Sequence, residues 1–330
     1  MDQESAAPGV RAEAIFNEVP VVRIDNAPAK FGAFSQASEV DIIAARAAER
    51  RVFGEIERLG LQRHAWELDT RGWTVIEPEK VGSPDFIRYL RDRAIAVNER
   101  VHGVTIDLEK GLSDPSRIMS FGEGVSVEGI LYEDPAFEQA IANEAAIALI
   151  SYLLGESCLI SSVGGIIKNQ GSQHMEMHVD AVGMPSPLPN IPVVANATWL
   201  LTDYSGEYGA TCFVDGSHHL CRPPTPSEAV DLSLFKPVEA PAGSIIVWGA
   251  NVWHGAVPRT APGIRVGLLC FYSRWYMYKG EADPAQRITP EMLARNGTRF
   301  RRLSGVDGLS LHPDGSDKAT RGRVAASRFA

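Results

Sequence analysis

The first half of the chain carries apolar residues at helical spacing, and the second half carries short apolar runs. Three stretches with apolar positions every three or four residues predict helices: residues 38–60, 83–103 and 134–155. Ser38 and Ser83 are suitable N-terminal caps, and Gly60 is a suitable stop. The segment "GWTVIEP" at 72–78, between the first two helices, predicts a short strand.

After Gly155 the pattern changes to runs of β-branched and aromatic residues separated by Gly, Pro and Asn. Examples are "VVANATWLLTDY", "ATCFVDGSH", "GSIIVWGANVWHG" and "IRVGLLCFYSRWY". Strands at such regular intervals are typical of a β-sandwich or barrel. Because helices precede the strands as a block, without βαβ alternation, the pattern predicts an α+β protein with a mainly β core.

The same pattern divides the chain into an arm, one folded domain and a tail. The two ends mix Pro, Gly, Ser and charge without sustained periodicity, so we expect the arm to be partly disordered. The expected boundaries are 1–35 for the N-terminal arm, 36–304 for the domain and 305–330 for the C-terminal tail. Within the domain we expect a helical part over 36–155 and a β core over 156–280.

The composition is that of an ordinary soluble globular protein, with 330 residues, 45% hydrophobic and 22% charged. The net charge is −9 and no run of five or more Lys and Arg occurs, which argues against a nucleic-acid partner. The most apolar stretch, 145–155, is shorter than the roughly 20 residues that cross a bilayer. The N-terminus lacks the pattern of a signal peptide. We therefore expect no membrane partner and a cytoplasmic location.

Candidate metal ligands gather in the stretch "HMEMHVD". Side chains two apart on a strand share a face, so His178 and Asp180 can form a two-ligand pincer. A set of two histidines and one carboxylate binds Fe(II) and leaves coordination positions open. Among the eight histidines, His254 in "IIVWGANVWHGAV" is the best third ligand. However, His174 and Glu176 have the same spacing, so alternation alone does not choose between the two pairs.

Chance and a purely structural role both stay open as alternatives to a metal site. A short HxD pattern also arises by chance, and His254 can equally be a core histidine that donates to a carbonyl. Two kinds of zinc site are excluded. The four cysteines form no CxxC pair, and no Glu directly follows the first His as HExxH requires.

Four motifs then occur in a fixed order: "HVD" at 178–180, "ATWLLTDYSGEYGATCFVDGSHH" at 197–219, "PAGSIIVWGANVWHGAV" at 241–257 and "GIRVGLLCFYSRWY" at 263–276. Each motif alone is weak, but the ordered set is specific. It resembles the phytanoyl-CoA dioxygenase family of non-haem Fe(II), 2-oxoglutarate-dependent oxygenases.

The resemblance implies a double-stranded β-helix, a cupin-like jelly-roll whose mouth holds the metal, with the N-terminal helices as outer support. It assigns iron to His178, Asp180 and His254, with 2-oxoglutarate and O2 as co-substrates. It makes Arg265 the anchor for the distal carboxylate of 2-oxoglutarate. The chemistry agrees, because a guanidinium pairs bidentately with a carboxylate and is costly in an apolar run without an anionic partner. The alternative is that Arg265 pairs with a structural Asp or Glu.

Three further residues match positions near the co-substrate in similar enzymes: Trp199, Thr211 and Lys168. The first two can equally be core residues, and the third can be no more than a surface charge. One departure from the family pattern also matters. Ala256 replaces a hydroxyl residue that often lies two positions after the last histidine ligand, so one hydrogen bond to the co-substrate is expected to be missing.

The resemblance implies hydroxylation of an unactivated C–H bond, with release of succinate and CO2. Aromatic residues near the end of the β core suggest a small, largely apolar or ring-bearing metabolite as substrate, with an ordinary core role as the alternative: Trp253, Trp275, Tyr276 and Tyr278. Relatives with the same triad also desaturate, epoxidise, form endoperoxides or rearrange rings. A cupin-like iron dioxygenase without 2-oxoglutarate and a non-catalytic jelly-roll that binds a ligand are the remaining hypotheses. The sequence is compatible with a homodimer.

Overall fold

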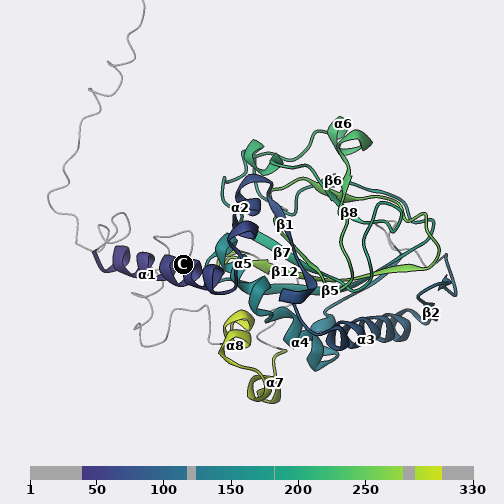
Figure 1. The fold of residues 1–330 in the computed structure, drawn as a ribbon, viewed down its shortest axis with the longest axis horizontal. Coiled ribbons are helices and arrows are strands. Elements are labelled where there is room, and N and C mark those ends of the chain that lie inside the picture. The colour runs from purple at the N-terminus through teal and green to yellow at the C-terminus, as the bar shows by residue number, and fades with distance from the viewer. Residues whose placement is uncertain (1–38, 117–123, 182, 278–286, 307–330) are drawn as a thin grey trace, which may run out of the picture. The chain divides into compact units, whose positions relative to one another are not determined.

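Antiparallel strands form the centre of the molecule (Figure 1). The structure is a computed structural model that describes residues 39–116, 124–181, 183–277 and 287–306. Its strands are β1 (Trp73–Ile76), β2 (Ile106–Asp107), β3 (Gly111–Leu112), β4 (Gly124–Glu128), β5 (Leu159–Asn169), β6 (Met175–His178), β7 (Val194–Leu200), β8 (Thr211–Phe213), β9 (Lys236–Pro237), β10 (Ile245–Gly249), β11 (His254–Ala256) and β12 (Ile264–Ser273).

These strands form two main sheets and a small hairpin of β2 and β3. The order in the larger sheet is β1-β10-β7-β12-β5-β4, and the order in the smaller sheet is β6-β11-β8-β9. The two sheets pack face to face through aromatic rings. The ring of Phe213 on β8 stacks on Trp73 of β1 at 4.7 Å between centroids and contacts Trp248 of β10 at 5.5 Å. This arrangement confirms the predicted double-stranded β-helix.

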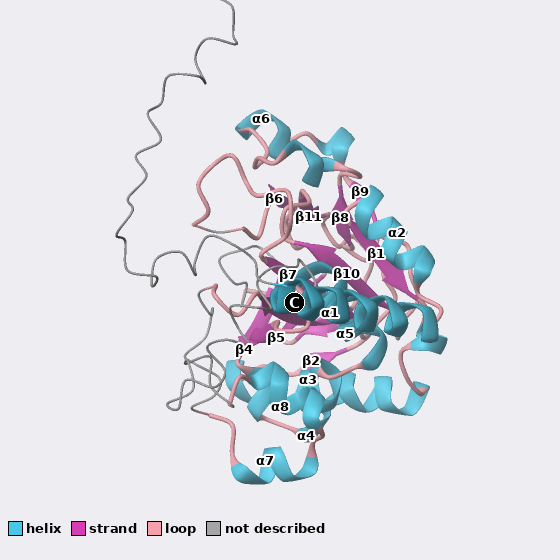
Figure 2. Ribbon diagram, turned by 90° about the vertical axis from the view of Figure 1, so that its left-hand side faces the viewer, coloured by secondary structure: helices cyan, strands magenta, loops and turns pink. Residues whose placement is uncertain are grey.

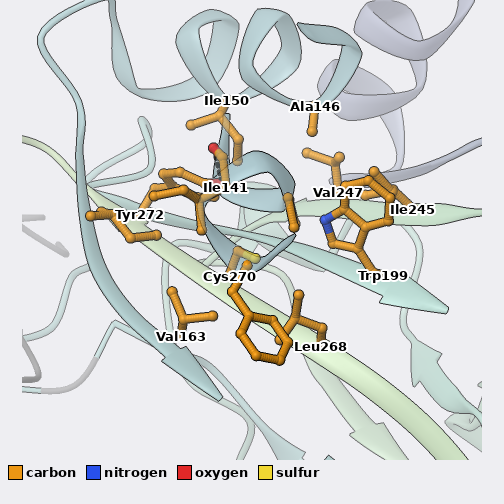
Figure 3. Close-up of a cluster of buried hydrophobic side chains, with 14 of the residues drawn as sticks. Ile141, Ala146, Ile150, Val163, Trp199, Ile245, Val247, Leu268, Cys270 and Tyr272 are labelled. Carbon is orange, nitrogen blue, oxygen red and sulfur yellow. Dashed lines mark hydrogen bonds between the residues drawn. The ribbon is translucent and has the colours of Figure 1, made fainter. Parts of the chain in front are cut away.

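Most of the helices cover the other face of the larger sheet, whereas β6, β8, β11 and the short helix α6 lie on the opposite side of it (Figure 2). The helices are α1 (Glu39–Arg58), α2 (Gln62–Thr70), α3 (Pro84–His102), α4 (Pro135–Ile141), α5 (Glu144–Leu154), α6 (Pro226–Ala229), α7 (Pro290–Arg295) and α8 (Thr298–Ser304). The main hydrophobic core lies between this face and the helices (Figure 3). There the Tyr272 hydroxyl of β12 donates to the carbonyl of Ile141 at 2.8 Å.

Two of the three predicted helices are confirmed. The predicted helix over 38–60 is α1, and Gly60 follows it with a φ of +63°. The predicted helix over 83–103 is α3, whose first turn is capped by the Ser83 side chain. The strand predicted at 72–78 is β1. Sequence periodicity missed α2, because its "QRHAWELDT" buries only three side chains and carries little apolar pattern.

The single helix predicted over 134–155 is wrong, because the chain breaks into α4 and α5 at Ala142 and Asn143. The Asn143 side chain caps α5 by accepting from the Ala146 N–H at 3.1 Å. Its amide also donates to the carbonyl of Val81 at 2.8 Å, which ties the break to the loop before α3. Side-chain capping of this kind competes with helix continuation, and apolar spacing does not reveal it.

The predicted arm lies outside the described residues, as do all but the first two residues of the predicted tail. The domain boundaries therefore stay a prediction. None of the helices in the described ranges combines the length and the apolar character needed to cross a bilayer.

We expect Asn143→Ala to lower the free energy of unfolding by about 1–2 kcal/mol, because α5 loses its N-terminal cap. Urea unfolding followed by circular dichroism measures this change. Asn143→Asp is the matched control, since it keeps the cap acceptor and loses only the donor to Val81; it should recover part of the loss. Equal stability of the wild type and Asn143→Ala would contradict the capping role.

Candidate metal centre

Three potential ligands come from two neighbouring strands and the turn that follows one of them. His178 ends β6 and His254 begins β11, and their Cα atoms are direct partners in the antiparallel pair. Their rings therefore lie on one face, with centroids 4.3 Å apart. Asp180 lies two residues beyond His178, and its N–H donates to the carbonyl of Ala250 at 3.0 Å. This bond ties Asp180 to the loop that leads into β11.

The side chains of these three residues converge on one point. Each offers one ligand atom, and these atoms all lie within 4.8 Å of one another. The two carboxylate oxygens of Asp180 divide between the imidazoles. Oδ1 lies 3.6 Å from Nε2 of His178, and Oδ2 lies 3.3 Å from Nε2 of His254. His254 is buried, whereas the other two side chains are partly exposed.

The backbone selects the tautomer of both imidazoles. Nδ1 of His178 lies 2.8 Å from the Glu176 carbonyl, and Nδ1 of His254 lies 3.1 Å from the Val252 carbonyl. A carbonyl only accepts, so each Nδ1 carries a proton and donates. In its neutral form, each ring then presents a lone pair on Nε2 to the carboxylate. Because lone pairs and a carboxylate repel one another, the donor set fits a shared cation, and its composition suits Fe(II).

Charge coupling within the cluster favours the ionised carboxylate. Burial opposes ionisation of Asp180, but the imidazoles, His254 before His178, hold the pKa of its carboxyl below the usual range. Burial likewise opposes a charge on His254, yet the adjacent carboxylate stabilises a proton on its Nε2 and raises the pKa of that imidazole; a metal ion bound by both groups takes the place of this proton. Asp180 therefore stays ionised, which is the state that a metal ligand needs.

Asn196 supports the carboxylate from the opposite sheet. It is fully buried on β7, and its Nδ2 donates to Oδ2 of Asp180 at 2.6 Å. Aromatic rings complete the wall, since Phe213 and Trp248 lie 5.9 and 5.3 Å from the His254 ring. Motif reasoning missed Asn196. A sequence cue existed, because an Asn within the apolar run "VVANATWLL" must find a hydrogen-bond partner when buried.

The rival pair, His174 and Glu176, lies outside the cluster. Both residues are exposed, and the ring of His174 contacts Phe235 at 6.3 Å between centroids. A bulge explains why spacing alone did not separate the pairs. His254 is paired with His178 and Ala256 with Met175, so a step of two residues along β11 corresponds to a step of three residues along β6. The extra residue turns the side chains that precede it to a different direction.

Two buried cations lie on the inner face of the larger sheet. Arg265 on β12 is directly paired with Lys168 on β5, and their exposed fractions are 3% and 0%. Arg265 donates to the Gly209 carbonyl, and its guanidinium carbon lies 4.7 Å from the ring centre of Tyr204. Lys168 is thus not a surface charge. The register of β12 and β7 puts Arg265 and Asn196 on the same face of the larger sheet, the face from which Asn196 reaches Asp180.

Thr211 and Trp199, both predicted to lie near the co-substrate, belong to different sheets. Thr211 begins β8, half-buried, and its Cα is paired with that of Ala256, two residues beyond His254. Trp199 faces the helices instead, with the ring of Phe86 5.9 Å away and edge-on (Figure 3). Side chains alternate along β7, so Asn196 points inward and Trp199, three residues later, points to the opposite side of the sheet. This corrects the prediction that Trp199 lines the co-substrate pocket.

Comparisons with known proteins agree with this geometry. Residues 87–267 match the model of the family described as phytanoyl-CoA dioxygenase, PhyH, which is more than half of the chain. The chain is 31% identical over 147 residues to dioxygenase af480 of Aspergillus fumigatus. That match covers 44% of this chain and 47% of the relative, so it spans about half the length of that protein.

Solved structures share the fold at low sequence identity. HygX from Streptomyces hygroscopicus, with nickel and 2-oxoglutarate bound, has a TM-score of 0.52 at 16% identity and covers 72% of this chain and 94% of its own. EctD from S. alaskensis, with 2-oxoglutarate and 5-hydroxyectoine, has a TM-score of 0.50 at 18% identity, covering 72% and 84%.

We expect His178→Ala and His254→Ala to weaken Co(II) binding by more than about 100-fold, because each removes a ligand, whereas loss of a supporting hydrogen bond costs roughly 10–100-fold. Anaerobic titration followed by the visible spectrum of Co(II) measures the affinity. His174→Ala and Glu176→Gln are the matched controls from the same stretch and should bind as the wild type does. Loss of binding in these controls instead would move the metal to the other pair.

Asn196→Ala should weaken Co(II) binding by about 10- to 100-fold without changing the fold, because Asp180 loses the donor that orients its carboxylate. Thr198→Val is the control on the same strand and face, since the Thr198 hydroxyl is buried without a hydrogen-bond partner among the described residues. Circular dichroism checks folding of both variants. Unchanged affinity in Asn196→Ala would show that the carboxylate is held by other contacts.

Proposed function

Since the chain belongs to the phytanoyl-CoA dioxygenase family, we propose that it hydroxylates an unactivated C–H bond of a small, largely apolar or ring-bearing metabolite. The family consists of non-haem Fe(II), 2-oxoglutarate-dependent oxygenases, and its cofactors are iron, 2-oxoglutarate and O2. A cytoplasmic location and a homodimer remain part of the proposal.

Two observations carry this proposal: His178, Asp180 and His254 converge on one point, and Arg265 and Lys168 are paired, buried cations on the larger sheet. Three protein ligands leave coordination positions open for further ligands. Two adjacent cations suit an anion with a carboxylate at its far end. The neighbour crystallised with nickel and 2-oxoglutarate supports this assignment by analogy of fold.

When bound, iron and 2-oxoglutarate would supply the oxidation: one oxygen atom of O2 would enter succinate as CO2 is released, and the other would enter the new hydroxyl group of the substrate. The chain supplies position and surroundings. Arg265 would hold the distal carboxylate, with Lys168 beside it, and Asn196 keeps the Asp180 carboxylate oriented. The rings of Phe213 and Trp248 exclude water from the side of His254.

The inner face of the larger sheet supports an apolar substrate. Leu269 and Phe271 face inward in the second half of β12, yet both remain partly exposed. Of the aromatic residues singled out in the sequence, Trp253 is buried and donates its Nε1–H to the carbonyl of Arg222 at 2.8 Å. Tyr276 is exposed beside Trp275, with ring centroids 5.6 Å apart, and Tyr278 lies outside the described residues.

The competing hypotheses account for less of the site. A dioxygenase without 2-oxoglutarate needs the iron ligands but gives no role to Arg265 and Lys168 as an adjacent buried pair. A non-catalytic jelly-roll that binds a ligand gives no reason for three metal-binding side chains to converge. Desaturation, epoxidation, endoperoxide formation and ring rearrangement use the same site, and product analysis with the natural substrate separates them from hydroxylation.

Arg265→Gln should weaken 2-oxoglutarate binding to the Co(II)-loaded protein by about 10- to 100-fold, because a charge-assisted pair with the distal carboxylate is lost. Isothermal titration under anaerobic conditions measures the binding, and Co(II) affinity is the internal control that should stay unchanged. Succinate release with the Fe(II) form should fall in parallel. Wild-type protein that binds iron but neither binds nor consumes 2-oxoglutarate would favour the dioxygenase that works without it.

A further inference from the structure

Trp248 brings a polar group to the metal centre whose role the site described above leaves open. The residue lies on β10 and is 4% exposed. Its Cα is paired with that of Asn196 on β7, so both side chains point to the inner face of the larger sheet. The centroid of its ring lies 5.3 Å from that of His254. Trp248 therefore adjoins both a potential metal ligand and the residue that supports Asp180.

The indole nitrogen of Trp248 is a donor in need of an acceptor. Nε1 is buried and makes no hydrogen bond of good geometry with any of the described residues. A buried polar group without a partner is rare in a folded protein. An indole N–H donates but has no lone pair to offer, so it cannot itself bind a cation. Any role of this group at the metal centre therefore passes through an acceptor.

The acceptor beside the indole is the carboxylate of Asp180. Its Oδ2 accepts from Nδ2 of Asn196 at 2.6 Å and lies 3.3 Å from Nε2 of His254. Both of these residues adjoin Trp248, which places Oδ2 on the side of the indole. The pKa of the Asp180 carboxyl agrees with this placement. Burial raises it, but His254, then His178 and then the N–H of Trp248 hold that pKa below its usual range.

The packing around Trp248 makes its N–H a fixed donor. β10 lies between β1 and β7, and the direct partners of Trp248 on these strands are Trp73 and Asn196. Phe213 of the smaller sheet packs edge-on against the indole, with an angle of 66° between the rings. A ring that is packed on several sides keeps its rotamer. The indole therefore does not follow a carboxylate that turns.

We propose that Trp248 is a positioning residue of the metal centre: its indole N–H donates to the Asp180 carboxylate and, with the amide of Asn196, keeps that carboxylate from turning. A hydrogen bond to an ionised acceptor is stronger than one between neutral groups. A carboxylate binds a metal through one oxygen or through both. Held from the side of Oδ2, Asp180 would offer Oδ1 alone and occupy one coordination position. This consequence rests on the proposed function of the triad.

Trp199 is a matched control for the indole donor. It is likewise buried, and its Nε1 also lacks a hydrogen-bond partner within the part of the chain that the structure describes. Its ring contacts Phe86 on the helix side of the larger sheet, the side opposite Asp180. Trp199→Phe therefore removes the same atoms as Trp248→Phe, away from the metal centre.

Nuclear magnetic resonance of ¹⁵N-labelled indoles tests the hydrogen bond directly in the metal-free full-length chain. Of the six tryptophan signals, Trp248→Phe and Trp199→Phe assign the two that matter. Asp180→Ala should move the Trp248 N–H signal upfield, because the donor loses a charged acceptor. The Trp199 signal should keep its position, which reports that the core is intact. A Trp248 signal that stays in place or moves downfield overturns the proposal.

Co(II) affinity tests the positioning role. Trp248→Phe should weaken Co(II) binding by about 10- to 100-fold, the usual cost of losing a partner that orients a metal ligand. Trp199→Phe should bind Co(II) as the wild type does, and circular dichroism checks the folding of both variants. Unchanged affinity in folded Trp248→Phe overturns the proposal. An equal loss in both variants identifies a packing effect and overturns it as well.

Binding of 2-oxoglutarate to the Co(II)-saturated protein tests the consequence for the open positions. Trp248→Phe should weaken this binding severalfold, because a carboxylate that turns can occupy a second position with its other oxygen. Unchanged 2-oxoglutarate affinity refutes this consequence. Failure of the wild type to bind Co(II) at all refutes the proposed function instead, and the comparison of indole signals in the metal-free protein still decides whether Trp248 donates to Asp180.

Discussion

The arrangement of the site depends on one interaction, the Asp180 carboxylate held between the Nε2 atoms of two imidazoles. Those nitrogens face the carboxylate because each Nδ1 donates to a carbonyl two residues earlier in the chain. Strand pairing brings His178 and His254 together, and the Ala250 carbonyl and the Asn196 amide hold Asp180 from two sides. A cation at the centre relieves the repulsion among these acceptors.

The sheet divides its two faces between stability and chemistry. Along β7, Trp199 faces the helices and joins the main core, while Asn196 faces the metal centre. Along β12, Tyr272 and Cys270 belong to the same core, whereas Arg265 and Phe271 face inward. Because successive side chains alternate, a strand can be anchored by one face and still present polar groups on the other. The helices therefore support the site without contributing to it.

Much of this could be predicted from the sequence, because helical spacing, turn residues and ordered motifs are local features. The fold class, the helices α1 and α3, and the residues that converge as a triad all came from such features. The break at Asn143 did not, because capping depends on one side chain and on the distant Val81 carbonyl. Strand alternation alone did not choose between the two pairs, since one extra residue in β6 changes which side chains share a direction; the ordered motifs favoured His178 and Asp180 over His174 and Glu176.

The remaining differences concern long-range contacts. Lys168 is wholly buried on β5, an interior strand that lies between β12 and β4 in the larger sheet, and strand order of this kind cannot be derived from the local sequence. Asn196 lies on the larger sheet, and its partner Asp180 follows a strand of the smaller sheet, a long-range contact that local sequence does not reveal. The central claim is that the triad binds iron together with 2-oxoglutarate. Anaerobic addition of Fe(II) and 2-oxoglutarate tests it most directly. The account predicts a weak visible metal-to-ligand charge-transfer band in the wild type that is absent in His254→Ala; no band in the intact wild-type protein would contradict it.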